Sequence, residues 1–182
     1  RMAIGDKYLD SGNLYAARFN ADGSGEWIEL NISNAKIAAY AAYSFANQAD
    51  VLVNARIAAD AVGATRMDRP EWCGVHPNTG EIYFTLTNNS NRAVEPGSSQ
   101  LAPDNSNPRA YSDAKGSSTQ KGNVNGHILR IREGSAGSTA TSFAWDVYLF
   151  GAQADADKSL INLSNLTADQ DFSSPDGIAF SP

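Results

Sequence analysis

The chain has 182 residues, 42 % of them hydrophobic, which is enough to build a core and argues against a disordered chain. The net charge is −6 at pH 7 and the basic residues are scattered, so a nucleic-acid-binding protein is not expected. No run reaches the roughly 18 apolar residues that a membrane helix needs. One cysteine, Cys73, and two histidines exclude an intrachain disulfide and a Cys/His zinc site.

The first part of the chain predicts a short strand pair. Apolar and polar residues alternate at 13–19 in the manner of a strand, and a turn at 20–27 leads into a short strand at 27–30. The turn lacks the ligand that an EF-hand loop requires at its twelfth position, so we interpret it as a hairpin turn.

A helix is predicted at 48–62, and a shorter one within 34–43. Small apolar residues of the longer helix recur at spacings of three and four, which places them on one face: Val51, Ala55, Ala58 and Val62. Gly63 is expected to end this helix as its C-cap.

The rest of the chain predicts two further strand pairs. The first is a β-hairpin of 72–76 and 81–87 with the turn PNTG at 77–80, and the second joins 126–133 to 142–151. Between the two pairs lies a polar segment, 88–125, with almost no apolar periodicity, which predicts a long loop that is functional or disordered. The acidic stretch 154–171 also fails the EF-hand pattern and is interpreted as a solvated loop.

Strand pairs that recur at roughly 40–50 residues are typical of propeller blades. We therefore predict an all-β fold, part of a β-propeller of about two blades, with a short α-helical insertion and long polar loops. Because neither end coincides with a natural domain boundary, residues 1–182 are expected to be a single fragment of a larger propeller domain.

The segment DRPE, residues 68–71, is the first candidate site. Pro70 cannot donate to a strand ladder and disfavours helical backbone before it, so we expect an extended Arg69 at a strand entrance, with side chains facing a channel. A carboxylate there would pair with a cation or bind a metal, and Arg69 offers a fork suited to phosphate or carboxylate. The alternative is that Asp68, Arg69 and Glu71 form a surface ion network.

Asp176, in the segment SPDG, is the second candidate. PDG is a common turn, so Asp176 is either a turn residue or a carboxylate at the inner end of a strand, aimed at a metal. Oxygen ligands such as Glu71 and Asp176 would favour calcium or magnesium.

Other polar residues leave their roles open. Three Asn-rich segments, 87–92, 105–109 and 123–128, could ligate calcium or hold a ligand, but Asn also fills loops. His127 is interpreted as a structural histidine and Cys73 as a small buried thiol. The chain has no GxSxG motif, and neither histidine has an obvious partner for a nucleophile–histidine–acid triad.

Several segments, in their order, resemble the PhoX family of bacterial alkaline phosphatases: LYAARFNADGSGEWIEL, VNARIAADAVGATRMDRPEW, EIYFTLTNNSNR, NPR, GHILRIRE, FAWDVYLFG and FSSPDGIAF. The resemblance covers nearly the whole chain, and its most specific element is MDRPEW followed by TLTNN. Members of this family are exported β-propeller enzymes that use calcium and iron, which implies a periplasmic or secreted location.

The resemblance also implies roles for individual residues. Glu71 would be a calcium ligand, Arg69 would contact the substrate phosphate, and Asp176 would be a further carboxylate on the metal side. No residue of this chain is assigned as catalytic. The implied partners are a phosphate monoester substrate and the remainder of the chain's own propeller, with no nucleic acid and no membrane span.

The chain also departs from the family. The family's iron-binding cysteine lies upstream, Cys73 does not match it, and little phosphatase activity is expected from this chain alone. One alternative is a non-catalytic, propeller-derived binding or assembly module. Another keeps calcium but changes the reaction to that of a lactonase-like or phytase-like propeller.

Overall fold

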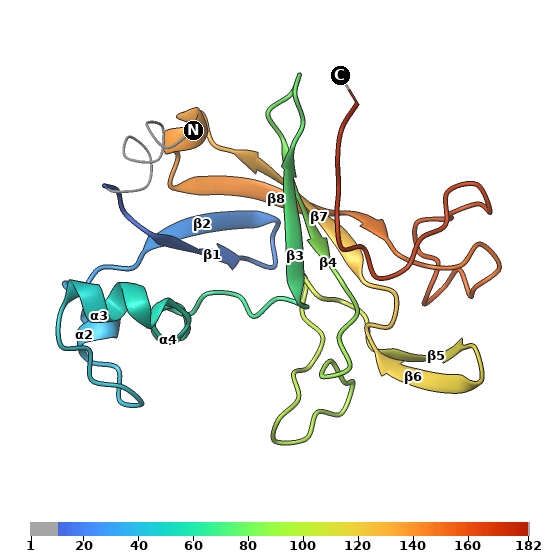
Figure 1. Ribbon diagram of the computed structural model, residues 1–182, viewed down its shortest axis with the longest axis horizontal. Helices are drawn as coiled ribbons and strands as arrows, with labels where there is room; N and C mark the ends of the chain where they lie inside the picture. The colour runs from blue at the N-terminus through green and yellow to red at the C-terminus, as the bar shows by residue number, and fades with distance from the viewer. Residues whose placement is uncertain (1–10, 182) are drawn as a thin grey trace. The chain divides into compact units, whose positions relative to one another are not determined.

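The computed structural model describes residues 11–181, so both ends of the predicted range 1–182 lie outside the described residues. The chain forms two compact units (Figure 1). Unit 1 comprises the chain up to Phe19 together with Gly25–Thr65, and unit 2 comprises Asn20–Ser24 together with the chain from Arg66 onward. The structure is mostly β with a few short helices, which confirms a strand-rich fold, whereas the propeller blades stay a prediction.

Unit 1 contains a hairpin and a small helical cluster. Strands β1 (Tyr15–Phe19) and β2 (Ser24–Glu29) pair antiparallel, from Tyr15 opposite Glu29 to Phe19 opposite Gly25. The predicted hairpin turn is confirmed, although β2 begins three residues before the predicted position 27. The core beside the hairpin consists of five buried apolar residues: Leu30, Ile37, Val51, Ala58 and Val62.

The predicted helix at 48–62 is interrupted at one residue. It forms α3 (Gln48–Val53) and α4 (Ala55–Val62), and the predicted helix within 34–43 is only the single turn α2 (Ala35–Ala38). Asn54, at φ −102° and ψ 38°, separates α3 from α4, and its side-chain amide donates to the Asp50 carboxylate at 2.8 Å. Asn competes for such local hydrogen bonds, which explains the break. Gly63 ends α4 in the left-handed conformation, at φ 78°, as predicted.

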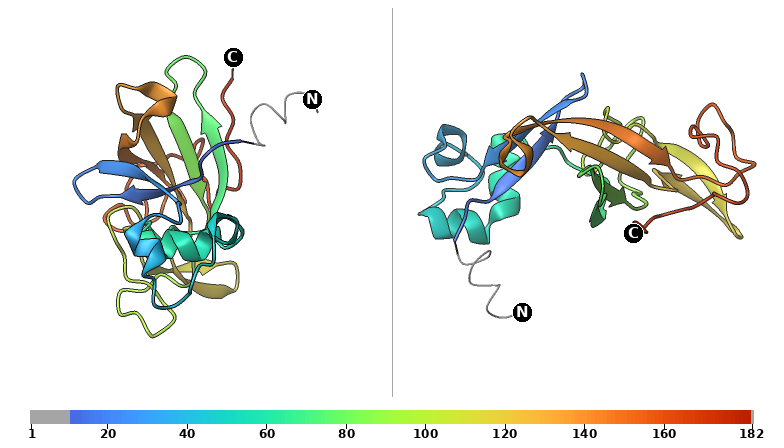
Figure 2. Two further views of the ribbon diagram at one scale, coloured as in Figure 1. Left: turned by 90° about the vertical axis from the view of Figure 1, so that its left-hand side faces the viewer. Right: turned by 90° about the horizontal axis from the view of Figure 1, so that it is seen from above.

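Unit 2 is built on an antiparallel sheet in which β3 is followed by β4, β7 and β8. These strands are β3 (Pro70–Val75), β4 (Ile82–Leu86), β7 (His127–Glu133) and β8 (Ser142–Phe150). Strands β7 and β8 run side by side over most of their length (Figure 2). Both predicted strand pairs are confirmed, and a short 3₁₀ turn, Gly137–Thr139, connects the second pair.

The edge strand β3 is exposed along almost its whole length. Trp72 and Val75 are 57 % and 58 % exposed, and the Cys73 thiol is also exposed. The prediction that Cys73 is a buried thiol is therefore wrong, because no further strand covers this edge within residues 11–181.

The polar segment 88–125 is not one continuous loop. It contains the hairpin of β5 (Tyr111–Lys115) and β6 (Ser118–Gly122). Sequence alternation missed β6 because residues 118–121 are all polar and exposed, so neither face of that strand carries an apolar signal.

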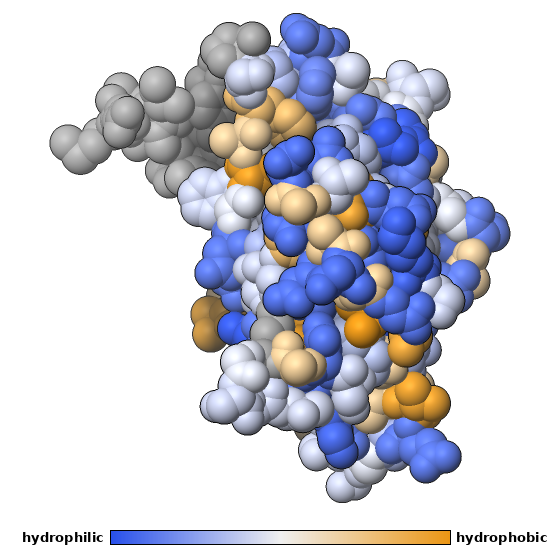
Figure 3. Space-filling view, turned by 90° about the vertical axis from the view of Figure 1, so that its right-hand side faces the viewer, coloured by the Kyte–Doolittle hydropathy of each residue, from blue (hydrophilic) through white to orange (hydrophobic). Residues whose placement is uncertain are grey.

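The acidic stretch 154–171 is a loop, as predicted, with Asp155 and Asp157 exposed. It lies at the right of Figure 1, on the side drawn in Figure 3, where hydrophilic side chains predominate and hydrophobic ones are scattered. Ile161 and Leu166 anchor the loop in a buried cluster with Tyr111, Val124 and Ala152. None of the helices described for this chain is long and apolar enough to cross a membrane.

Candidate functional site

Arg69 sits at the entrance of β3 with an unusual backbone. Its φ is 43°, in the left-handed region that non-glycine residues seldom adopt, so the prediction of an extended Arg69 is wrong. Its N–H donates to the carbonyl of Met67 at 3.1 Å, and its carbonyl accepts the N–H of Thr87 at 3.2 Å. Such conformations persist only where the surroundings enforce them, and they are frequent at binding sites.

The guanidinium of Arg69 is held on one side and open on the other. Its Nη1 donates to both the carbonyl and the Oδ1 of Asn88, each at 3.1 Å. Its Nη2 lies 3.7 Å from Glu71, in an exposed ion pair whose Arg and Glu side chains are 55 % and 38 % exposed. An exposed pair of this length contributes little to stability. The fork therefore has a fixed position and donors available to an anion.

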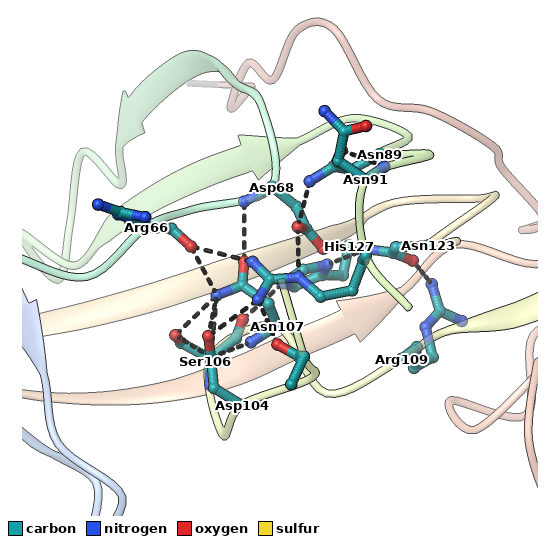
Figure 4. Close-up of polar contacts among 12 residues, drawn as sticks. Arg66, Asp68, Asn89, Asn91, Asp104, Ser106, Asn107, Arg109, Asn123 and His127 are labelled. Carbon is teal, nitrogen blue, oxygen red and sulfur yellow. Dashed lines mark hydrogen bonds and ion pairs between the residues drawn. The ribbon is translucent and has the colours of Figure 1, made fainter. Parts of the chain in front are cut away.

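Asp68, one residue earlier, lies in a buried polar network (Figure 4). Its carboxylate accepts hydrogen bonds from Asn89 at 2.7 Å, from Nε of Arg92 at 2.9 Å and from Asn123 at 3.1 Å. Asp68 is 0 % exposed. The alternative interpretation, a surface ion network, therefore holds for the contact between Arg69 and Glu71. It is wrong for Asp68, which is buried.

Arg92 balances the charge of Asp68 and is itself buried. Its Nη1 donates to the carbonyl of Ala102 at 2.7 Å and to Asp104 at 3.2 Å, and its Nη2 donates to the carbonyl of Arg66 at 2.9 Å. A buried charge is tolerated when it is paired and its donors are satisfied, so Arg92 ties the segment before β3 to the 102–104 loop.

Asn107 closes the same network from the other side. Its Oδ1 accepts the backbone N–H of Asp68 at 2.8 Å, and its amide donates to Asp104 at 2.9 Å. Ser106 lies beside it and contributes its carbonyl to the ring of His127 at 2.8 Å. Three polar loops thus converge on the residues that precede β3.

His127 is a buried structural histidine, as predicted. The amide of Asn123 donates to Nδ1 of His127 at 2.9 Å, so Nε2 carries the proton and donates to the Ser106 carbonyl. Burial lowers the pKa of His127 from its ordinary value of 6.5 to about 4. The ring is therefore neutral near pH 7.

Arg109 ties the network to the loop that follows β8. Its guanidinium donates to the carbonyls of Gly151 and Ile161 at 3.0 and 2.6 Å, to Asn123 at 3.1 Å, and to the carbonyl of Gly126. Burial lowers the pKa of Arg109, whose fork also lies over the ring of Phe150.

Asp176 lies on the C-terminal segment and is exposed. This segment is held to the residues before β7, because Ser173 donates to the Asn125 side chain at 2.8 Å and the N–H of Ser174 donates to the Asn125 carbonyl at 2.8 Å. A methyl group added to Gly126 would lie 3.0 Å from Pro175 and would collide with the carbonyl of Leu86.

Asp176 and Arg69 are therefore attached to the same end of the sheet. Leu86 pairs with Pro70, the residue after Arg69, while the backbone of Gly126 abuts the Leu86 carbonyl on one side and Pro175 on the other. The predicted site residues come from two separate segments, 68–71 and 174–177. The pairing of β3 with β4 and the packing of Gly126 between Leu86 and Pro175 bring these segments to one end of β3, β4 and β7.

The donor set fits a hard cation only in part. Glu71 and Asp176 are exposed carboxylates, the ligand type that calcium prefers. Within residues 11–181, no group of three or more His, Cys, Asp or Glu is placed to hold a metal ion. These residues could therefore contribute ligands to a cluster that other segments complete.

Comparison with protein-family models matches residues 4–182 to the family described as alkaline phosphatase PhoX. The chain belongs to the PhoX alkaline phosphatase family. Among solved structures it is similar to Pseudomonas fluorescens PhoX in complex with vanadate, a transition state analogue, with 39 % sequence identity and a TM-score of 0.76. That match covers 98 % of this chain and 30 % of the other. A comparison with curated proteins gives no match.

Membership of the PhoX family confirms the resemblance drawn from the segments around MDRPEW. The chain spans 30 % of the length of Pseudomonas fluorescens PhoX, so the activity of a whole PhoX protein is not a property of these residues alone. The roles of Arg69, Glu71 and Asp176 stay predictions.

Sequence reasoning missed the buried network behind Arg69. Its members come from the three Asn-rich segments, which supply Asn89, Arg92, Asn107 and Asn123. The density of Asn in otherwise unpatterned sequence was the available signal. Without the fold, these side chains could not be told from ordinary loop residues.

Proposed function

We propose that this chain is the part of a calcium- and iron-dependent PhoX alkaline phosphatase that binds the phosphate group of a phosphate monoester. Family membership supports the reaction class. The observation that carries the proposal is the Arg69 guanidinium, anchored to Asn88 at 3.1 Å and 55 % exposed at the start of β3.

Arg69 would act through its planar fork. Guanidinium groups bind phosphate oxygens with two parallel hydrogen bonds, and a fork that is already positioned loses less conformational entropy on binding. The relative solved with vanadate, named as a transition state analogue, supports a site for a phosphate-like anion in this family. Arg69 is thus proposed as a substrate-binding residue.

Glu71 and Asp176 are proposed as metal ligands. Both are exposed carboxylates on segments that meet at the Arg69 end of the sheet. When bound, calcium and iron would stabilise the negative charge of the phosphoryl group during transfer. The carboxylates would hold such cations beside Arg69, whose positive charge already lies 3.7 Å from Glu71.

The proposal extends to the parent fold and its location. The antiparallel order β3, β4, β7 and β8 within the larger sheet is compatible with a propeller blade whose innermost strand is β3. We therefore propose that the remainder of the polypeptide completes a β-propeller. We also propose a periplasmic or secreted location.

The test uses the full-length protein that carries this chain. Arg69→Lys is expected to weaken binding of inorganic phosphate by roughly tenfold or more, because an ammonium group cannot form the two-pronged contact. Arg56→Lys changes an exposed arginine on α4 and is the matched control. Equal phosphate affinity in the two variants would argue against the role of Arg69.

Metal content tests the two carboxylates separately. Glu71→Gln and Asp176→Asn are expected to lower the calcium or iron bound per chain, measured by elemental analysis, whereas Glu95→Gln, at another exposed acid, should leave it unchanged. A wild-type protein that binds neither metal and hydrolyses no phosphomonoester would favour the non-catalytic binding module.

A further inference from the structure

Asp68 and Arg69 are adjacent in the chain but have opposite environments. Asp68 is 0 % exposed and bound by three side chains, whereas the Arg69 side chain is 55 % exposed. The backbone between them is in the left-handed conformation at Arg69. A strained residue next to a fully bonded buried charge indicates that the charge holds the strain in place.

The backbone of Arg69 is fixed from the Asp68 side. The N–H of Asp68 donates to Asn107 at 2.8 Å, and its carboxylate pairs with Arg92 at 2.9 Å. With both its main chain and its side chain bonded, Asp68 cannot rotate without breaking buried hydrogen bonds. These bonds therefore fix the direction of the backbone at the next residue, Arg69.

A second series of contacts connects the Asp68 carboxylate to the guanidinium of Arg69. Its anchor is Asn88, and the next residue, Asn89, donates to Asp68 at 2.7 Å. Asn89 is also bonded through its main chain to Asn123, at 2.9 and 3.0 Å, and Asn123 donates to the other oxygen of Asp68. Asp68 thus holds both the backbone of Arg69 and the peptide that receives its side chain.

We propose that Asp68 is a positioning residue for Arg69, which it orients for a phosphate-like anion before the anion binds. The proposal rests on the proposed phosphate-binding role of Arg69. Asp68 is buried and does not touch the anion. Asp68 lowers the conformational entropy that the Arg69 guanidinium loses when the anion binds. Replacing Asp68 should therefore weaken anion binding only when Arg69 is present.

The test is a double-mutant cycle in the full-length protein, with Asp68→Asn, Arg69→Ala and the combined variant. The dissociation constant for inorganic phosphate is measured by calorimetry, together with KM and kcat for p-nitrophenyl phosphate. Asp68→Asn is expected to raise the phosphate dissociation constant on the order of tenfold when Arg69 is present. In the Arg69→Ala background it should cause no further rise, because the group it positions is gone.

Two further variants separate positioning from loss of stability. Asn89→Ala removes one hydrogen bond of Asp68 but leaves its ion pair with Arg92, and it should reproduce the weaker phosphate binding in a folded protein. Asn162→Ala removes a buried amide bonded to the carbonyls of Ala154 and Leu166 in the loop that follows β8, so it should destabilise the protein without changing phosphate affinity.

The possible outcomes are distinct. An increase caused by Asp68→Asn that is the same in both Arg69 backgrounds, or absent from both, would overturn the positioning role. If Arg69→Ala alone left phosphate affinity unchanged, the proposed function itself would fail, and the positioning role with it. Iron and calcium contents equal to those of the wild type in the Asp68→Asn variant exclude metal loss as the cause of an effect.

Discussion

The two units of this chain are stabilised by different kinds of interior. Unit 1 is held by an apolar cluster in which Ile37, Val51 and Ala58 are fully buried. Unit 2 has apolar clusters as well, but the residues before β3 rest on a buried network of charges, amides and an imidazole centred on Asp68. The proposed phosphate site is attached to the second kind of interior.

The difference has a physical consequence. Apolar contacts are non-directional, so a hydrophobic cluster tolerates small changes of shape at a modest cost. Hydrogen bonds and buried ion pairs require specific partners at specific angles, and removing one partner leaves the other uncompensated. Unit 2 can therefore fix the direction of Arg69 in a way that an apolar cluster could not.

The largest expected effect is that of Arg92→Met. This change leaves the carboxylate of Asp68 buried without its cation, and breaking such a pair costs about 3–5 kcal/mol. Native-state hydrogen exchange of the β4 and β7 amides in the full-length protein would measure it. Arg18→Met, which removes a partly exposed pair with Glu26 in unit 1, should cost about 1 kcal/mol. Comparable losses would erase the contrast between the units.

Two glycines with similar backbones offer a second comparison. Gly63 in unit 1 and Gly126 in unit 2 have φ of 78° and 65°. Gly63→Ala should cost about 1–2 kcal/mol from backbone strain alone, since the nearest atom to the new methyl group is 3.8 Å away. Gly126→Ala should cost roughly 1–3 kcal/mol more, because the methyl group would collide with the Leu86 carbonyl. Chemical denaturation of both variants would measure the difference, and similar midpoints would contradict the crowding at Gly126.

The third prediction concerns pH and unit 2. The folded protein binds a proton at His127 only near pH 4, whereas the unfolded chain binds it near 6.5, so acid favours unfolding between these values. Stability from this group is fully present above pH 6.5 and should fall by about 1.4 kcal/mol for each pH unit below it, until pH 4. Hydrogen exchange of β7 should show this slope. The His127→Gln variant should have a smaller one, and an unchanged slope would exclude His127 as its source.

The smallest expected effect is that of Ile37→Val in unit 1. Removing one methylene from a fully buried side chain should cost about 0.5–1.5 kcal/mol, measured from the exchange of α4 amides. The phosphate affinity of the full-length protein should not change. A loss as large as that of Arg92→Met would mean that the apolar cluster is as sensitive to change as the polar network.

Much of the fold could be predicted because its signals are local. Alternation identified β1, β4, β7 and β8, and the left-handed Gly63 marked the end of α4. The β5–β6 hairpin was missed because polar, exposed strands have no hydrophobic period. The break at Asn54 was missed because the sequence does not show whether an Asn inside a helical segment will cap a helix or continue it.

The site was predictable in its residues but not in its geometry. The DRPE and SPDG segments singled out Arg69, Glu71 and Asp176 as chemistry-bearing side chains, and these segments meet at one end of the sheet. The extended backbone expected for Arg69 and the buried thiol expected for Cys73 were both wrong. Each error concerned an environment that distant segments create.

The sequence by itself determined the PhoX family, the strand-rich character and the residues able to bind phosphate or a hard cation, since these depend on residue identity and short-range order. Only the tertiary structure decided that Asp68 turns inward while Arg69 turns outward. That choice depends on Asn89, Arg92, Asn107 and Asn123, which lie 21 to 55 residues away from Asp68. A carboxylate is buried only where such partners converge, and convergence is a property of the folded chain.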